Sequence, residues 1–293
     1  MILIVGCGYL GNYLAKEVLK NTDEPLIVTT RSADRLAFSS SVKCAYCDVA
    51  DVESVVKLAD LCRGEELTVF YLAAQHNVDF VYENPEKARQ INIQGLKNFL
   101  SFVPNIKKLF FASTDCVYGE GKGLSGKFSE ADALAPINEY GRQKTEAENI
   151  VLAKGYTVLR LPFMLGQSLG EKPHFYDRIY SDLVKGEKIE LIDGMERSVL
   201  SYAQAAEYMY ALSLLEDAPQ IINVCADEAL SKYEIGCIIA EKAGVSAENI
   251  KRISEEEGKV FFKEVRASYV AMDNTLLKGL LNIEKIQWEE EKC

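Results

Sequence analysis

The sequence lacks the segments that mark several classes of protein. Its 293 residues contain no apolar run near the roughly 20 residues that span a membrane. Low-complexity tracts and internal repeats are also absent, which argues against a disordered chain or a solenoid. The first residue leads directly into ILIVG with no basic segment before it, so we do not expect export through a cleaved leader.

Positive charge is scarce as well. The chain has 33 lysines and arginines against 44 aspartates and glutamates, a formal net charge of −11. Such a protein is repelled overall by nucleic acid and by anionic membranes, and we expect neither as a partner. An anionic small molecule would have to be bound by local arginines and backbone amides.

Histidines are few, and the cysteines are scattered. Of eight cysteines, only Cys44 and Cys47 lie close together, and the two histidines are His76 and His174. A zinc site would need a second cysteine pair or more histidines, so we expect no metal. We interpret the cysteines as small buried apolar groups in a reducing cytoplasm.

Short β-rich runs alternate with helical patterns in the first half of the chain. The runs ILIV, EPLIVTT, VKCAYCDV, LTVFYLAA, KKLFFAS and YTVLRL are the expected strands. This order predicts an α/β fold with a Rossmann-type, doubly wound parallel sheet. We expect a dinucleotide-binding domain over residues 1–165, joined by residues 196–220. Residues 166–293 should form a smaller mixed α/β lobe that binds substrate.

A glycine motif, GCGYLG, lies between the first expected strand and the first helix. Gly6 would allow a sharp turn, Gly8 would let a pyrophosphate approach the backbone, and Gly11 would let the helix pack closely. With Tyr9 and Leu10, these residues would present the free N–H groups of a helix N-terminus to the phosphates. The motif predicts a dinucleotide site.

The second expected strand ends in VTTRSADR, where NAD enzymes of this type place an acidic residue. Thr30, Arg31 and Ser32 would suit the 2′-phosphate of NADP(H), which we take as the preferred cofactor. In the alternative, Arg31 stacks on the adenine and Asp34 reaches the ribose of NAD(H). Asp48, after the third strand, is a candidate acceptor for the adenine amino group.

NEYGRQKTE places Tyr140 and Lys144 four positions apart on one helical face. A neighbouring ammonium would lower the pKa of the phenol and make it a competent proton donor or acceptor. The preceding strand, FFAST, ends in Ser113 and Thr114, where a hydroxyl could bond the same substrate oxygen.

These motifs, with YLAAQHNVDFVYENPEKARQINIQG and LRLPFMLG, resemble the extended short-chain dehydrogenase/reductases in order and spacing. The resemblance covers about residues 1 to 215, with a fainter echo to about 285. Its nearest branch is that of dTDP-4-dehydrorhamnose reductase and its 4,6-dehydratase relatives. It implies that Tyr140 is the catalytic acid/base, that Lys144 is its electrostatic partner, and that Thr114 orients the substrate. It also assigns cofactor contacts to Val49, Ala73, Ala74, Asn92, Leu161 and Pro162, besides the residues above.

Three departures from that family bear on the reaction. The glycine motif is shorter than the usual G-x-x-G-x-x-G, Cys116 stands where dehydratases carry glutamate, and Gln204 stands where relatives often have aspartate. The last two argue against a dehydratase and against a standard epimerase.

Substrate contacts are expected from the segment after the fifth strand and from the second half of the chain. Arg160, Arg197 and Arg266 fall in or near segments that bind diphosphate in sugar-nucleotide enzymes, and an ordinary surface or strand-end arginine is the equal alternative for each. The remaining candidates for substrate binding are Thr114, Asp115, Cys116, His174 and Phe175, whereas we expect His76 to be structural.

The sequence thus predicts a cytoplasmic NADP(H)-dependent oxidoreductase that reduces a keto group of a nucleotide sugar. The alternatives are a nucleotide-sugar epimerase with retained NAD, a reductase of a non-sugar carbonyl, and a non-catalytic NADP-binding redox sensor. A homodimer is left open.

Overall fold

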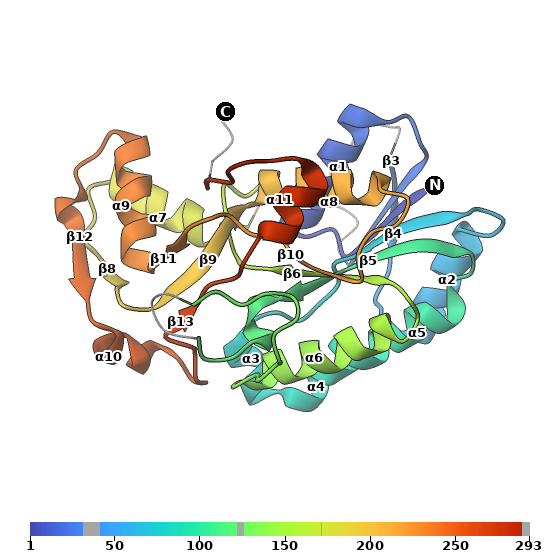
Figure 1. The fold of residues 1–293 in the computed structure, drawn as a ribbon, viewed down its shortest axis with the longest axis horizontal. Helices are drawn as coiled ribbons and strands as arrows, with labels where there is room; N and C mark the ends of the chain where they lie inside the picture. Colours follow the sequence, from blue (N-terminus) through green and yellow to red (C-terminus); the bar gives the residue numbers. More distant parts are fainter. Residues whose placement is uncertain (32–41, 122–125, 171, 289–293) are drawn as a thin grey trace.

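The centre of the protein is a seven-stranded parallel sheet with the strand order β3-β2-β1-β4-β5-β6-β10 (Figure 1). The computed structural model describes residues 1–31, 42–121, 126–170 and 172–288. The chain reverses its direction of travel across the sheet between β1 and β4, which is where open α/β sheets bind ligands. The strands are β1 (Ile2–Val5), β2 (Leu26–Thr30), β3 (Val42–Tyr46), β4 (Leu67–Tyr71), β5 (Ile106–Thr114), β6 (Thr157–Leu161) and β10 (Ile221–Asn223).

Helices cover both faces of this sheet because its strands carry apolar side chains on both sides. In β1, Ile2 and Ile4 belong to one apolar core, and Leu3 and Val5 belong to the other. The first core includes α1 (Tyr9–Asn21), α8 (Tyr202–Leu214) and α11 (Thr275–Leu281). The second includes α2 (Val52–Leu61), α5 (Gly95–Phe102) and α6 (Glu139–Leu152). The doubly wound sheet predicted from the sequence is confirmed.

Two short helices and a π-helical turn precede α5 on the second face. They are α3 (Val78–Glu83), α4 (Pro85–Arg89) and the π-helical turn Gln90–Gln94. Such turns inside helices frequently mark functional positions. Figure 1 shows these elements beside α6, below the sheet.

The second half of the chain adds two smaller sheets. Strand β9 (Glu196–Ser201) pairs with β7 (Phe163–Leu165), β11 (Ala229–Leu230) and β13 (Tyr269–Val270). Strand β8 (Ile189–Ile192) pairs with β12 (Ile250–Ile253), beside the helices α7 (Phe175–Val184), α9 (Lys232–Ala243) and α10 (Glu255–Gly258). This part is mixed α/β, as predicted. The domain boundaries remain a prediction. Strand β10, which directly follows the segment 196–220, is an edge strand of the large sheet.

Over the ranges that the structure describes, no helix is both long and apolar enough to cross a bilayer. The same residues contain no cluster of three or more side chains suited to hold a metal ion. Cys7, Cys47, Cys62 and Cys225 are buried thiols, whereas Cys44 is exposed.

Candidate active site

The glycine turn after β1 is pressed against the end of β4. Gly6 has a φ of +91°, and a Cβ there would lie 2.6 Å from the Cα of Ala73. The N–H of Gly6 donates to Thr29 Oγ1 at 3.0 Å, which fixes the turn on β2 as well. A residue with a side chain could therefore occupy position 6 only by displacing the backbone of Ala73.

The start of α1 offers its backbone to a ligand. Gly8 precedes the helix without any side-chain cap, and a Cβ on it would meet nothing within 4 Å. Gly11 is buried, and a Cβ on it would lie 3.2 Å from Gly6 O, so the helix packs closely on the turn. An uncapped helix N-terminus with open space before it fits the pyrophosphate of a dinucleotide. Tyr9 and Leu10, in the first turn, are half-buried.

The residues predicted to meet the adenosine lie at the ends of β2 and β3. Thr30 is the last residue of β2, and Arg31 follows it with an exposed side chain. Ser32 and Asp34 lie outside the described residues. Asp48 follows β3, and its Oδ1 accepts from the N–H of Ala50 at 3.1 Å.

Val49 lines this region by packing. It is 4% exposed, and a Cβ on Gly95 would lie 2.6 Å from its Cγ2. The carbonyl of Val49 accepts from Asn98 Nδ2 at 3.2 Å. Helix α5 therefore approaches the end of β3 closely and holds Val49 in place. At the end of β6, Leu161 and Pro162 are also buried.

Asn92 fastens the loop after β4. Its Oδ1 accepts from the N–H of Gln75 at 2.8 Å, and its Nδ2 donates to Gln75 O at 3.1 Å. Its Nδ2 also donates to Gln143 Oε1 on α6 at 3.0 Å. The π-helical turn thus ties the segment containing Ala73 and Ala74 to α6.

Tyr140 and Lys144 both point inward from α6. Tyr140 is 8% exposed and Lys144 is 2% exposed. Lys144 Nζ donates to Ala112 O at 2.5 Å and lies 3.9 Å from the centre of the Phe111 ring. Burial, opposed by Glu148, lowers the pKa of Lys144 to about 7. A lysine poised near neutrality is typical of functional sites.

The predicted lowering of the Tyr140 pKa is wrong for the polypeptide by itself. Burial is the largest cause of a raised pKa at Tyr140, and Cys116 and Asp115 add to it. Only Arg197 opposes the rise. Lys144 is directed at the backbone of β5, so helical spacing alone does not tune the phenol. The buried phenol remains protonated and is suited to donate.

The two hydroxyls at the end of β5 point in different directions, as adjacent strand residues must. Ser113 Oγ donates to Glu148 Oε1 at 2.5 Å inside the protein. Thr114 Oγ1 donates to Asp115 Oδ1 at 3.0 Å and accepts from the N–H of Cys116 at 3.3 Å. Thr114 therefore lies in the same cluster as Cys116, which is close enough to influence Tyr140.

Arg197, from β9, joins this cluster. It forms a bidentate ion pair with Asp115, in which Nε lies 2.9 Å from Oδ2, and its Nη2 lies 3.3 Å from Cys116 Sγ. Although burial alone would lower it, Asp115 and Cys116 raise the pKa of Arg197, which therefore stays charged. Burial raises the pKa of the Cys116 thiol, and Arg197 partly opposes this. Asp115 thus accepts from both Arg197 and Thr114.

Of the two alternatives left open for Arg160, contact with a diphosphate is contradicted by the structure. Its side chain is 2% exposed and forms an ion pair with Glu148 at 2.8 Å. Its Nη1 donates to Tyr118 Oη at 2.8 Å. Strand β6 is buried on both faces, so its arginine is directed into the core.

Arg266 and Lys232 bring two further cations toward this side of the protein. Arg266 Nη2 donates to Asp79 Oδ1 of α3 at 2.8 Å. Lys232 Nζ lies 4.9 Å from the centre of the Phe262 ring, and burial, Arg197 and Arg266 lower its pKa to about 8. Lys232 went unnoticed in the sequence because a lysine in the first turn of a helix is unremarkable there.

His174 is the N-cap of α7 and lies against the first turn of α1. Its ring centre is 4.7 Å from that of Tyr9, and its Nε2 is 3.2 Å from Tyr202 Oη. Burial, with a contribution from His76, lowers the pKa of His174 to about 4. Phe175, the next residue, packs on Phe163 with ring centres 5.4 Å apart. Helix α7 is thereby anchored beside the glycine turn.

Gln204 and His76 are the two remaining polar residues singled out in the sequence. Gln204 Oε1 accepts from Ser201 Oγ at 3.0 Å in the cap of α8, and its Nε2 donates to Gln287 O. His76 follows β4 and is exposed.

Comparison with known proteins identifies the family. The model described as "RmlD substrate binding domain" matches residues 1–292. "Methionine adenosyltransferase 2 subunit beta" of Danio rerio is 25% identical over 263 residues, covering 87% of this chain and 77% of that protein. "UDP-glucose 4-epimerase" of Lactobacillus helveticus is 26% identical over 234 residues, covering 74% and 69%.

Solved structures share the fold. The UDP-glucose 4-epimerase of Thermus thermophilus in complex with NAD superposes with a TM-score of 0.81 at 20% identity, covering 95% of this chain and 92% of that one. The resemblance drawn from the motifs is confirmed. The chain belongs to the RmlD substrate binding domain family, within the NAD(P)-binding extended short-chain dehydrogenases/reductases.

Proposed function

We propose that this protein is an NADP(H)-dependent reductase that acts on a keto group of a nucleotide sugar. One observation carries the proposal: Tyr140 and Lys144 are buried on one face of α6, where β5 ends in Thr114. The glycine turn of Gly6 and Gly8 lies at the ends of the neighbouring strands β1 and β4.

The residues suggest a division of labour in the reduction. When bound, NADPH would supply the hydride that the carbonyl carbon accepts. Tyr140 would donate its phenolic proton to the carbonyl oxygen, and Thr114 would hold that oxygen by a hydrogen bond. Lys144 has a pKa of about 7, and in its protonated form it would stabilise the phenolate that Tyr140 becomes. Solvent would then return the proton to Tyr140.

The preference for NADP(H) over NAD(H) is proposed from Arg31. Its exposed guanidinium follows β2 directly, in the position where a 2′-phosphate would be met. The hydroxyl of Thr30 would add a hydrogen bond. Asp48, Asn92 and the other expected cofactor contacts keep their proposed roles.

A nucleotide-sugar substrate is proposed from the cations near Tyr140. Burial lowers the pKa of Lys232, and Arg197 and Arg266 add to this, so the three cations lie within electrostatic range of one another. A diphosphate would neutralise such a cluster. A relative of this chain is named UDP-glucose 4-epimerase, which agrees with a nucleotide-sugar substrate.

The contacts of Asp115 favour reduction over dehydration. Elimination of water needs an acid and a base beside the sugar, whereas Asp115 is held by Arg197 and Thr114. Cys116 has a raised thiol pKa and is a poor substitute for the glutamate of dehydratases. The epimerase with retained NAD stays the second candidate.

The test is NADPH oxidation with dTDP-4-dehydrorhamnose and with UDP- and GDP-4-keto sugars, followed by mass spectrometry of the product. We expect one NADPH consumed per sugar reduced, and a loss of at least about 100-fold in kcat for Tyr140→Phe with unchanged NADPH affinity. Epimerised sugar without net NADPH consumption would show the second candidate to be correct. Turnover of dTDP-glucose to a 4-keto-6-deoxy product would overturn the reductase.

We also propose that residues 1–165 and 196–220 bind the cofactor and that residues 166–293 otherwise bind the substrate. A cytoplasmic location and a homodimer stay predictions of the same kind.

A further inference from the structure

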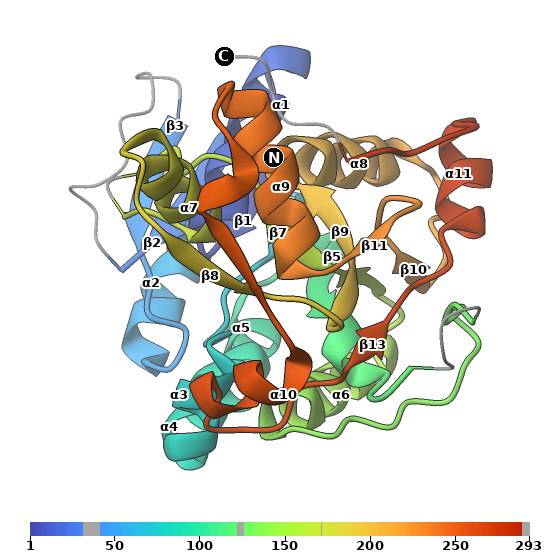
Figure 2. The ribbon, with the colours of Figure 1, turned by 90° about the vertical axis from the view of Figure 1, so that its left-hand side faces the viewer.

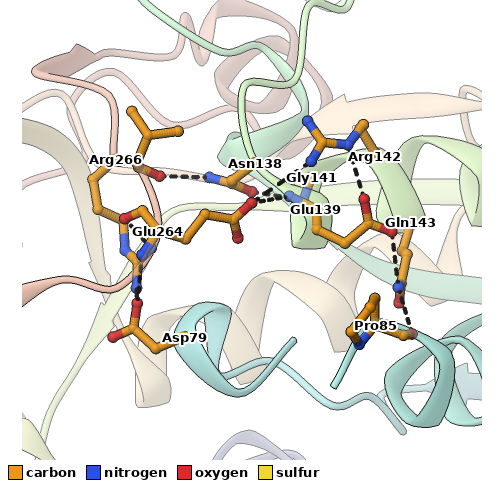
Figure 3. Close-up of polar contacts among 10 residues, drawn as sticks. Asp79, Pro85, Asn138, Glu139, Gly141, Arg142, Gln143, Glu264 and Arg266 are labelled. Atoms are coloured by element: carbon orange, nitrogen blue, oxygen red, sulfur yellow. Dashed lines mark hydrogen bonds and ion pairs between the residues drawn. The ribbon is translucent and has the colours of Figure 1, made fainter. Parts of the chain in front are cut away.

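A segment from the second half of the chain crosses to the start of α6. After α10, residues 259–266 run beside α3 and α6 before the chain enters β13 (Figure 2). We call residues 259–266 the strap. Its polar contacts are drawn in Figure 3 and involve Asp79, Asn138, Glu139, Arg142, Glu264 and Arg266.

Asp79 of α3 holds the strap at three points. Its Oδ1 accepts from the N–H of Lys263 at 3.1 Å, from the N–H of Glu264 at 3.3 Å, and from Arg266 Nη2 at 2.8 Å. Burial opposes ionisation of Asp79, but Arg266 and the two N–H groups lower its pKa below the usual value. The N–H of Glu264 is therefore held by Asp79, and its carbonyl accepts from Arg266 Nη1 at 3.0 Å.

From this position, Glu264 reaches the first residue of α6. Its Oε1 accepts from the N–H of Glu139 at 2.7 Å, although the two residues are 125 positions apart. Asn138 Oδ1 accepts from the N–H of Gly141 at 2.8 Å, as an ordinary N-cap. In the sequence of α6, Tyr140 lies between Glu139 and Gly141, whose N–H groups are held in this way.

The first turn of α6, which carries Tyr140, is packed closely against the end of β5. A Cβ on Gly141 would lie 2.5 Å from Cys116 O, so the turn rests on the segment that follows Thr114. A shift of the helix start would therefore move Tyr140 relative to the segment that follows Thr114.

Glu264 does not look like a residue kept for stability alone. It is 8% exposed, and its Oε2 is buried with no hydrogen-bond partner among the described residues. A buried carboxylate oxygen without a partner costs free energy. A cap on the surface would satisfy the Glu139 N–H without this cost.

We propose that Glu264 is a positioning residue for Tyr140: it fixes the first turn of α6 and thereby the place of the phenolic hydroxyl. The inference rests on the proposed function, in which Tyr140 transfers the proton. Small misplacements of a reacting group reduce rates strongly.

The test compares Glu264→Ala with Glu264→Gln, whose amide oxygen can still accept from Glu139. Lys263→Ala is the matched control, because Lys263 lies in the same strap and pairs with Glu83 at the surface. In NADPH oxidation with dTDP-4-dehydrorhamnose, we expect Glu264→Ala to lower kcat roughly tenfold or more with little change in KM for NADPH. Glu264→Gln and Lys263→Ala should stay within about threefold of the original protein.

Amide hydrogen exchange of residues 139–142 supplies a readout that needs no substrate. We expect faster exchange in Glu264→Ala and unchanged exchange in Glu264→Gln and Lys263→Ala. Unchanged exchange in Glu264→Ala, or faster exchange with an unchanged kcat, would overturn the inference. If Tyr140→Phe itself stays active, the proposed function fails, and the exchange data alone then decide whether Glu264 holds α6.

Discussion

Two arginine–carboxylate pairs flank the strand end that carries Thr114, and they differ in burial. Arg160 and Glu148 are 2% and 1% exposed, whereas Arg197 is 29% exposed over an Asp115 that is 0% exposed. Both arginines are diphosphate candidates in the sequence. The first pair is closed on every side, and the second keeps one side open. Exposure, not residue type, decides which arginine can meet a ligand.

The largest expected effect comes from breaking the closed pair. Arg160→Ala would leave the buried Glu148 carboxylate without its ion-pair partner, although Ser113 Oγ would still donate to it. We expect the free energy of unfolding to fall by about 3–5 kcal/mol. Urea denaturation followed by circular dichroism measures this loss.

The double variant Arg160→Met with Glu148→Met is the control for that prediction. It removes both charges and keeps apolar volume, so most of the lost stability should return. A loss below about 1 kcal/mol in Arg160→Ala would show that the pair is no more than a surface-like interaction.

A second effect concerns Lys144, which lies on α6 one turn before Glu148. Its pKa of about 7, lowered by burial, means that the unfolded chain holds this proton more tightly between about pH 7 and the usual lysine value. The stability cost is thus fully present below about pH 7 and decreases as the pH rises through that window. We expect Lys144→Met to stabilise the protein by about 2 kcal/mol at pH 6 and to abolish turnover.

Urea denaturation of both proteins at pH 6 and pH 9.5 checks this. The advantage of the variant should shrink at the higher pH, because the original lysine is then neutral in the folded state. A constant difference between the two pH values would contradict a lowered pKa at Lys144.

The sequence predicts what depends on local spacing. The strand and helix alternation, the glycine turn at Gly6 and Gly8, and the shared face of Tyr140 and Lys144 all follow from residues within one turn or one element. The sheet confirms the fold, the glycine turn follows β1, and Tyr140 and Lys144 share the buried face of α6. Their chemical roles remain predictions.

Contacts between distant segments could not be predicted in the same way. Arg197 and Asp115 are 82 positions apart, and Glu264 and Glu139 are 125 apart. No periodicity links such residues. The burial of Arg160 could not be predicted either, because the sequence of a buried strand with one arginine resembles that of a strand whose end binds an anion. The predicted lowering of the Tyr140 pKa is wrong for the same reason, because the burial of the phenol depends on the whole fold.

The third effect tests the open pair. In Arg197→Met with Asp115→Asn, no charge is left unpaired, so stability should change by about 1 kcal/mol or less. Loss of a charge-assisted hydrogen bond to the substrate costs about 1.5–3 kcal/mol, which would raise KM for the keto-sugar nucleotide more than roughly tenfold. Steady-state kinetics measure it. An unchanged KM would mean that Arg197 only holds Asp115.

The smallest effect concerns Arg31, an exposed arginine whose expected partner is a ligand. Since its side chain faces solvent, Arg31→Ala should alter the free energy of unfolding by no more than about 0.5 kcal/mol. We expect the original protein to bind NADPH at least tenfold more tightly than NADH, or about 1.4 kcal/mol, and the variant to lose that preference. Fluorescence titration of both cofactors measures this, and NADH affinity, which does not involve the 2′-phosphate, is the internal control. Equal affinities in the original protein, or a preference that survives in Arg31→Ala, would show that exposure after β2 is not sufficient to select the phosphate. Cofactor choice would then have to come from residues other than Arg31 around the adenosine.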